Sequence, residues 1–265
     1  MKLKITHSTQ YEYDEPVKYA LQQVRLTPAS DPNQTVLNWK IDIEGGSKEL
    51  AFCDQYGNET LLVQAKPGTS QVVINVSGEI ETHSSDGIYG KRYGVAPLWH
   101  FVTPTPRTMA GPGIHKLSKI VDADGDTLSS LHTLSRAILE AVPYNMNPTS
   151  AGTTAEEALN AKGGVCQDHA QIFISAARHA GIPARYISGY LLMDDRVDQD
   201  ASHAWAEAHV PDLGWVGFDV SNGISPDERY VRIAVGCDSL DAAPTSGMRL
   251  GQAAESMIVS LQIQQ

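Results

Sequence analysis

The sequence predicts an α+β fold, in which an antiparallel β domain over residues 1–100 precedes a mixed domain over residues 101–265. Three observations predict it. Short runs of alternating apolar and polar residues, separated by Gly, Pro, Asp and Asn, fill the first hundred residues. Apolar residues then recur at helical spacing between residues 126 and 180, and three strand-like runs follow up to residue 220.

The first domain consists of short strands without a convincing helix. Tyr56-Gly57-Asn58-Glu59 predicts a hairpin turn between two of these strands. The regular spacing is typical of an antiparallel sandwich or sheet, and no cluster of residues in it suggests chemistry. The predicted strands cover residues 2–6, 17–26, 36–43, 50–52, 60–63 and 71–81.

Four prolines between residues 94 and 113 mark an ordered linker, and the domain boundary is expected near it. A helical stripe runs from about Asp126 to Val142, where Pro143 ends it. Thr154 and Glu157 are spaced as a capping box that opens a short second helix. The later strands are predicted over residues 184–192, 202–210, 215–220 and 257–263, the last as a final strand of the second domain.

The candidate functional centre is the stretch Gly163–Ala170, where two glycines run into Cys166. The helical pattern that follows ends at Gly181 and Pro183, so Cys166 is expected in the first turn of a helix. Unpaired N–H groups and the positive end of the helix dipole favour a thiolate there. Cys166 is therefore a nucleophile candidate, although a buried structural role remains the alternative for any single cysteine.

A predicted hairpin supplies a base and a carboxylate. Alternation places His203 and Trp205 on one face of its first strand and Asp219 on a face of its second. If the turn centres on Pro211, His203 lies directly opposite Asp219, within reach of an imidazole–carboxylate hydrogen bond. A slip of one residue would separate them onto opposite faces. A cysteine, a histidine and an orienting carboxylate are the groups that thiol catalysis needs.

Composition limits the possible partners and compartment. The formal net charge of −11 argues against nucleic acid and anionic membranes as partners, and no apolar run is long enough for a membrane span. The N-terminus lacks the apolar region of a signal peptide. The three cysteines are too widely spaced for a metal knuckle and odd in number, which predicts a cytoplasmic protein without a disulfide framework.

Four separated blocks of this sequence resemble the transglutaminase-like superfamily, and more closely its bacterial and archaeal branch of cysteine-protease-like members. The N-terminal segments 6–13 and 23–28 are similar to the β-rich domain that precedes the core in this branch. The resemblance implies a papain-like core, with Cys166 as nucleophile, His203 as general base and acid, Asp219 as orienting carboxylate, and no metal or other cofactor. The four blocks are Gly164–Ala170, Gly181–Tyr190, His203–Glu207 and Phe218-Asp219.

The expected function is hydrolysis of amide or peptide bonds, in a peptide or protein substrate, through an acyl-enzyme. Acyl transfer to an amine by the same residues is an alternative, and a non-catalytic binding module on the same fold is another. A metal site formed by Cys166 and neighbouring residues is disfavoured because no ligand pair has zinc-like spacing. Gln167, Trp205 and Tyr144 are the candidate substrate-binding residues.

Two positions depart from the pattern of this family. Cys237 and Ser239 stand where Arg and Tyr are usual, which suggests an atypical substrate preference if this segment lines the cleft. The proline-threonine pair that often follows the aspartate is also missing after Asp219. The sequence leaves the oligomeric state and the natural substrate open.

Overall fold

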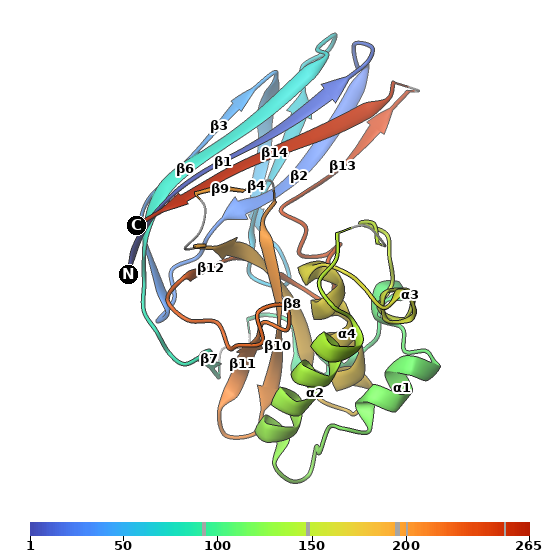
Figure 1. Ribbon diagram of the computed structural model, residues 1–265. Coiled ribbons are helices and arrows are strands. Elements are labelled where there is room, and N and C mark those ends of the chain that lie inside the picture. Colours follow the sequence, from blue (N-terminus) through green and yellow to red (C-terminus); the bar gives the residue numbers. More distant parts are fainter. Residues whose placement is uncertain (92–93, 147–148, 194–196, 200, 252) are drawn as a thin grey trace.

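The computed structural model describes residues 1–91, 94–146, 149–193, 197–199, 201–251 and 253–265. A β-sandwich lies against one side of a second sheet, and the helices cover the other side of that sheet (Figure 1). The strands are β1 (Lys2–Tyr13), β2 (Tyr19–Thr27), β3 (Gln34–Glu44), β4 (Gly46–Cys53), β5 (Glu59–Ala65), β6 (Gln71–Thr82), β7 (Ile88–Gly90), β8 (Ala184–Leu191), β9 (Asp198–Gln199), β10 (His203–Val210), β11 (Gly214–Phe218), β12 (Tyr230–Gly236), β13 (Thr245–Leu250) and β14 (Glu255–Gln264). The helices are α1 (Pro112–Ser118), α2 (Thr127–Ala141), α3 (Ala155–Ala161) and α4 (Cys166–His179), with short 3-10 turns at Leu98–Val102 and Pro106–Thr108.

The sandwich confirms the predicted β-rich first domain. Its sheets have the strand orders β3-β6-β1-β14-β9 and β13-β2-β5-β4. β1 and β6 alternate between buried and exposed residues along their length, as expected of strands with one face on a core. Their inward side chains pack against those of β2 and β5, in a core that includes Val24, Val63 and Ile74. The predicted hairpin is present, with Cys53 paired to Glu59 across the turn.

The C-terminal strands belong to the sandwich. The sequence had suggested instead that the last strand belongs to the second domain. β14 pairs along its whole length with β1, so that the two chain termini lie side by side (Figure 1). β13 pairs with β2 of the sandwich. Conversely, β7 lies within the first hundred residues but pairs with β11 of the second sheet. Alternation predicts a strand but not its partner, which explains why the division at residue 100 differs from the observed course of the chain.

The second sheet has the order β12-β8-β10-β11-β7 and is antiparallel throughout. α4 packs across β10 and β8, and its Phe173 stacks on Phe218 with ring centroids 4.8 Å apart. The start signals read from the sequence are present: Asp126 accepts a hydrogen bond from the first turn of α2, and Thr154 and Glu157 form a capping box on α3. α1 occupies part of the segment that was expected to be a linker.

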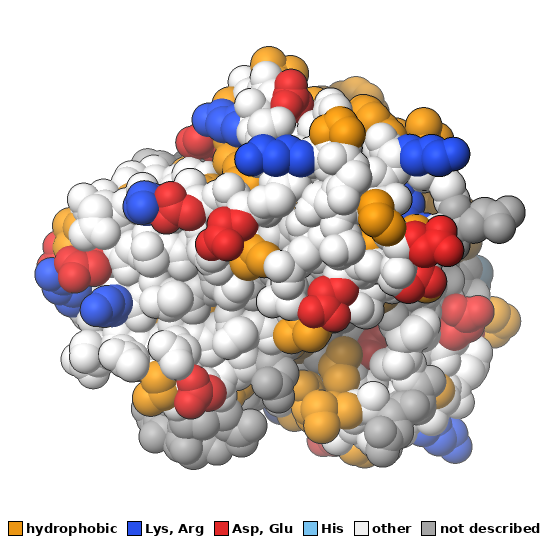
Figure 2. All heavy atoms as spheres, turned by 90° about the horizontal axis from the view of Figure 1, so that it is seen from above, with side chains coloured by type: hydrophobic (Ala, Val, Ile, Leu, Met, Phe, Trp, Pro, Cys, Tyr) orange, Lys and Arg blue, Asp and Glu red, His pale blue; other side chains and the backbone are white. Residues whose placement is uncertain are grey.

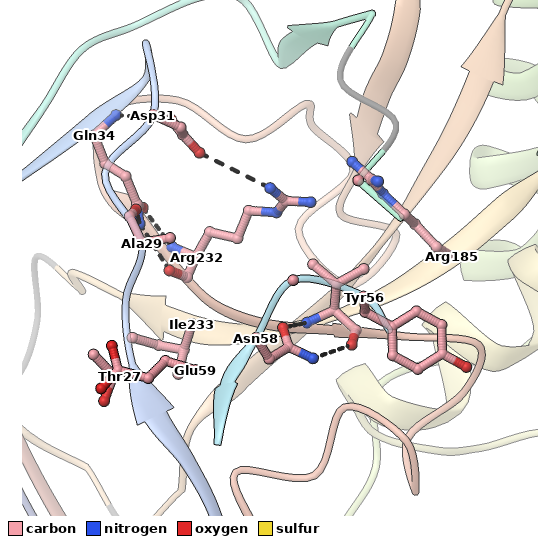
Figure 3. Close-up of a pocket in the computed structure, with 13 residues that line it drawn as sticks. Thr27, Ala29, Asp31, Gln34, Tyr56, Asn58, Glu59, Arg185, Arg232 and Ile233 are labelled. Atoms are coloured by element: carbon pink, nitrogen blue, oxygen red, sulfur yellow. Dashed lines mark hydrogen bonds and ion pairs between the residues drawn. The ribbon is translucent and has the colours of Figure 1, made fainter. Parts of the chain in front are cut away.

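Two amide side chains of the sandwich join it to the edge of the second sheet. Gln34 exchanges hydrogen bonds with the backbone N–H and carbonyl of Arg232, at 2.8 and 2.9 Å. Asn58 does the same with Val235, at 2.8 Å each way (Figure 3). The outer edge of β12, which would otherwise present unpaired backbone groups, is thereby closed by side chains instead of another strand.

The cavity drawn in Figure 3 lies at this junction and has a volume of about 160 Å³. Arg185 and Arg232 line it, and both bind Glu207, which is fully buried. The guanidinium of Arg185 also lies 3.9 Å from the ring centroid of Trp215. These ion pairs lie within the second sheet, and Asp31 of the sandwich adds a carboxylate 3.9 Å from Arg232 across the junction. Such pairing offsets the cost of desolvating buried ions.

The face of the molecule seen in Figure 2 carries acidic and basic side chains intermingled, without a single-sign patch. Within the described residues, no helix combines the length and the apolar character that crossing a membrane requires. Of the two cysteines outside the candidate functional centre, Cys53 is exposed and Cys237 is buried.

Candidate active site

Cys166 is the first residue of α4, as the sequence predicts. The preceding turn is fixed by Asp168, whose carboxylate accepts hydrogen bonds from the N–H of Val165 at 2.9 Å and from the hydroxyl of Thr149 at 2.7 Å. Gly164 permits this arrangement, because a Cβ on it would lie 2.8 Å from the Cβ of Asp168. Asp168 thus caps the helix, and the first N–H groups of α4 remain unpaired beside the thiol.

His203 and Asp219 are joined by a hydrogen bond of 2.6 Å between Nε2 and Oδ2. The predicted register of the hairpin is wrong by two residues, since Glu207 lies opposite Gly217 and Trp205 would lie opposite Asp219. A shift of two residues preserves the face on which each side chain lies, so the pair still meets diagonally. The extra residues lie in the turn, where Asp212 and Gly214 adopt positive φ angles.

Asp219 holds more partners than the sequence indicated. Its Oδ2 also accepts hydrogen bonds from the hydroxyl of Tyr230 and from the side-chain amide of Asn222, each at 2.7 Å. The N–H of Asn222 lies 3.3 Å from Oδ1. Sequence reasoning missed both residues, because Asn222 stands in an irregular turn and Tyr230 comes from β12, whose place in the sheet local patterns do not reveal.

The electrostatics favour a charged imidazole. Burial by itself would lower the pKa of His203, but hydrogen bonds to Asp219 and Cys166 and the charges of both raise that pKa to about 10. Burial by itself would raise the pKa of Asp219. The hydrogen bond and charge of His203, together with the bonds from Asn222 and Tyr230, instead lower this pKa. Because Nε2 of His203 faces Asp219, Nδ1 is the nitrogen left for the thiol. Cys166 and His203 line the same cavity, and Asp219 is bonded to His203 from behind.

A cavity of about 400 Å³ opens over Cys166 and His203. Of the predicted substrate-binding residues, Gln167 lines this cavity. Trp205 does not: it is 1 % exposed and packs against both His203 and Tyr230, with ring centroids 6.3 and 5.4 Å from theirs. Tyr144 is 55 % exposed and pairs through its backbone with Gly164, outside the residues that line the cavity. Both belong to the surroundings of the site and not to its wall.

The segment that departs from the resembling family does reach the cavity. Ser239 lines it and donates a hydrogen bond of 3.0 Å to Gln171 of α4. Cys237 is buried, and its carbonyl accepts a hydrogen bond from Arg178. Burial, as the largest influence, raises the pKa of the Cys237 thiol. A short side chain at Ser239 thus widens the cavity, whereas Cys237 has a packing role.

Neighbouring residues that a metal site would need are engaged elsewhere. His169 bonds through one ring nitrogen to the carbonyl of Val142 and through the other to Ser221. Burial lowers its pKa, which keeps the ring neutral. In the part of the chain that the structure describes, no three His, Cys, Asp or Glu side chains gather as metal ligands.

A helix that carries a cysteine at its N-terminus, packed on an antiparallel sheet that carries the histidine, defines a papain-like α+β class of protein. Residues 115–220 match the transglutaminase-like superfamily, and residues 3–81 match the bacterial transglutaminase-like N-terminal region. The chain therefore belongs to the transglutaminase-like superfamily, with the bacterial N-terminal region in front of the core.

Known proteins are similar to this chain over all or part of its length. An uncharacterised protein of Mycobacterium leprae is 25 % identical over 275 residues, covering 99 % of this chain and 98 % of its own. A protein-glutamine gamma-glutamyltransferase of Pseudomonas aeruginosa is 28 % identical over 150 residues, 47 % of this chain and 22 % of its own. The crystal structure of a "putative cysteine protease" from Cytophaga hutchinsonii shares the fold, with a TM-score of 0.76 at 22 % identity, covering 99 % of this chain and 90 % of its own.

Proposed function

We propose that this protein is a thiol hydrolase of amide or peptide bonds. The observation that carries the proposal is that Cys166 and His203 line one open cavity and that His203 is bonded to the buried Asp219. A thiol, an imidazole and a carboxylate in this order supply a nucleophile, its base and the group that orients the base. A cysteine with a purely structural role has no need of such a base.

The reaction begins with an ion pair between the Cys166 thiolate and the His203 imidazolium. The sulfur attacks the carbonyl carbon, and the unpaired N–H groups at the start of α4 stabilise the oxyanion. His203 then donates its proton to the leaving amine, the C–N bond breaks, and a thioester remains on Cys166. A water molecule, deprotonated by His203, attacks the thioester and releases the acid and the free thiol. Asp219 keeps the imidazole oriented and stabilises its positive charge throughout.

Acyl transfer to an amine is a second candidate, because the relative from Pseudomonas aeruginosa is named as a protein-glutamine gamma-glutamyltransferase. The first half of the reaction is identical, and only the group that attacks the thioester differs. Incubating the protein with peptide and protein donors, with and without a primary amine, separates the candidates by mass spectrometry. Cleaved or deamidated products support hydrolysis, whereas amine adducts support transfer. Products that persist in Cys166→Ala would contradict both, with Cys53→Ala as the matched control.

A further inference from the structure

The cavity over Cys166 has an uneven charge distribution. Apart from the candidate triad, its described wall consists mainly of small uncharged side chains, and Arg107 is the one residue there with a formal charge. Arg107 lies in the 3-10 turn Pro106–Thr108. Burial first, and then the charge of Cys166, raise the pKa of the nearby Tyr186 hydroxyl, and the charge of Arg107 opposes this rise. The guanidinium therefore faces the same space as the nucleophile. The small residues include Ser188, Ser202, Ser239, Ala243, Thr245 and Ser246.

Arg107 also differs from other shielded arginines in its partners. Arg25, Arg185 and Arg232 each form an ion pair with a carboxylate of the protein. Arg178, which is also buried, has no such pair among the described residues, but its guanidinium donates to the backbone carbonyls of three different residues. Arg107 is half-buried and donates through Nη1 to the backbone carbonyl of Ala151, and no carboxylate among the described residues pairs with it. A guanidinium has five N–H donors, so this one bond leaves most of them for a ligand in the cavity that Arg107 lines.

We propose that Arg107 binds a carboxylate of the substrate, and that the preferred substrates are therefore peptides or amides with a negative charge beside the scissile bond. This inference rests on the proposed thiol chemistry at Cys166. An arginine fork fits a carboxylate with two parallel hydrogen bonds, which are stronger than bonds between neutral groups. Outside the candidate triad, the described wall of the cavity offers no competing ion, and partial burial reduces screening by water. A substrate carboxylate in the cavity would thus form an ion pair with the Arg107 guanidinium, for which the described residues supply no carboxylate.

Two alkylating reagents of nearly equal size test the inference. Iodoacetate carries a carboxylate and iodoacetamide a neutral amide, and with each the Cys166 sulfur forms a bond to carbon while iodide leaves. The second-order rate constants are measured at Cys166 by mass spectrometry, at constant pH and ionic strength. We expect the ratio of iodoacetate to iodoacetamide rates to fall by about tenfold or more in Arg107→Gln, the loss of one charge-assisted interaction. In Arg107→Lys, which keeps the positive charge, the ratio of the two rates should fall by a smaller factor.

Arg136→Gln is the matched control, because Arg136 is an exposed arginine of α2 outside the cavity lining. Its ratio should remain that of the wild type. An unchanged ratio in Arg107→Gln, or an equal fall in Arg136→Gln, would overturn the role of Arg107 while leaving the thiol chemistry intact. Slow reaction of the wild type with both reagents would instead overturn the proposed function, and this inference with it. Protection of Cys166 by acetyl-Ala-Glu-Ala-amide over acetyl-Ala-Gln-Ala-amide, lost in Arg107→Gln, gives a second readout.

Discussion

Strand β10 carries two buried polar residues, His203 and Glu207, whose surroundings differ. His203 at the start of β10 and Glu207 four residues later lie on the same face, about 13 Å apart at the rise of an extended strand. Glu207 is enclosed between Arg185 and Arg232 at the junction with the sandwich. His203 joins Asp219 on one side and Cys166 on the other, and borders an open cavity. Buried charge alone therefore does not indicate chemistry; an accessible nucleophile beside it does.

The two centres are connected through β12. Gln34 and Asn58 of the sandwich hold the outer edge of this strand, and Tyr230 at its start binds Asp219. The sandwich thus positions one of the groups that hold the carboxylate behind His203. This arrangement gives the N-terminal region a mechanical role in the site, although it contributes none of the three candidate catalytic side chains.

Asp219→Asn should cause the largest loss, about 10³- to 10⁴-fold in turnover, because the imidazole loses its orientation and its compensating charge. The pKa of His203 should fall below about 10, since burial then dominates and lowers it. Turnover and the NMR titration of His203 provide the measurements. Asp42→Asn, an exposed carboxylate paired with Lys40, is the control. A His203 titration that stays the same in Asp219→Asn would contradict this account.

Glu207→Gln should instead destabilise the fold, by about 3–5 kcal/mol, because two arginines at the junction lose their shared carboxylate. Urea unfolding measures this change, and the protein that remains folded should keep a rapidly alkylated Cys166. Asp219→Asn should therefore lower turnover, whereas Glu207→Gln should lower the free energy of unfolding. If Glu207→Gln left stability intact and abolished alkylation, the assignment of the two centres would be reversed.

Tyr230→Phe should reduce turnover by about tenfold to a hundredfold, since it removes one hydrogen bond to a charged acceptor and leaves two others in place. Tyr190→Phe provides a matched comparison, because that buried hydroxyl bonds to His7 at 2.7 Å, away from the cavity. It should lose stability to a similar extent without a comparable change in turnover. Equal turnover losses in the two variants would show that Tyr230 acts only through packing.

Asn58→Ala should have the smallest effect, a loss of about 1–3 kcal/mol in stability from the two bonds to Val235. A small fall in turnover should accompany this loss of stability if a shift of β12 also moves Tyr230. Asn75→Ala, on the outer part of β6, is the control and should change stability by less. A stability loss in Asn58→Ala no larger than in Asn75→Ala would argue against the clamp on β12.

Much of the fold and the core of the site follow from local sequence patterns. The strands of the sandwich, the capped starts of α2 and α3, and the position of Cys166 are all local features, and the structure confirms them. His203 and Asp219 were paired despite a wrong register, because face parity survived the error. Tyr230, Asn222 and the return of β13 and β14 to the sandwich depend on long-range pairing, which alternation cannot specify.

The central claim is that Cys166 and His203 form a thiolate–imidazolium pair. The most direct test is the rate of iodoacetamide alkylation of Cys166 against pH, in the wild type and in His203→Ala. A His203 pKa raised from 6.5 to about 10 means that the stabilising charge is fully present below pH 6.5 and is lost as the pH rises through about 10. We predict fast alkylation well below pH 8.5, where a free thiol is mostly protonated, and its loss in His203→Ala. Ordinary thiol behaviour in both proteins would contradict the account.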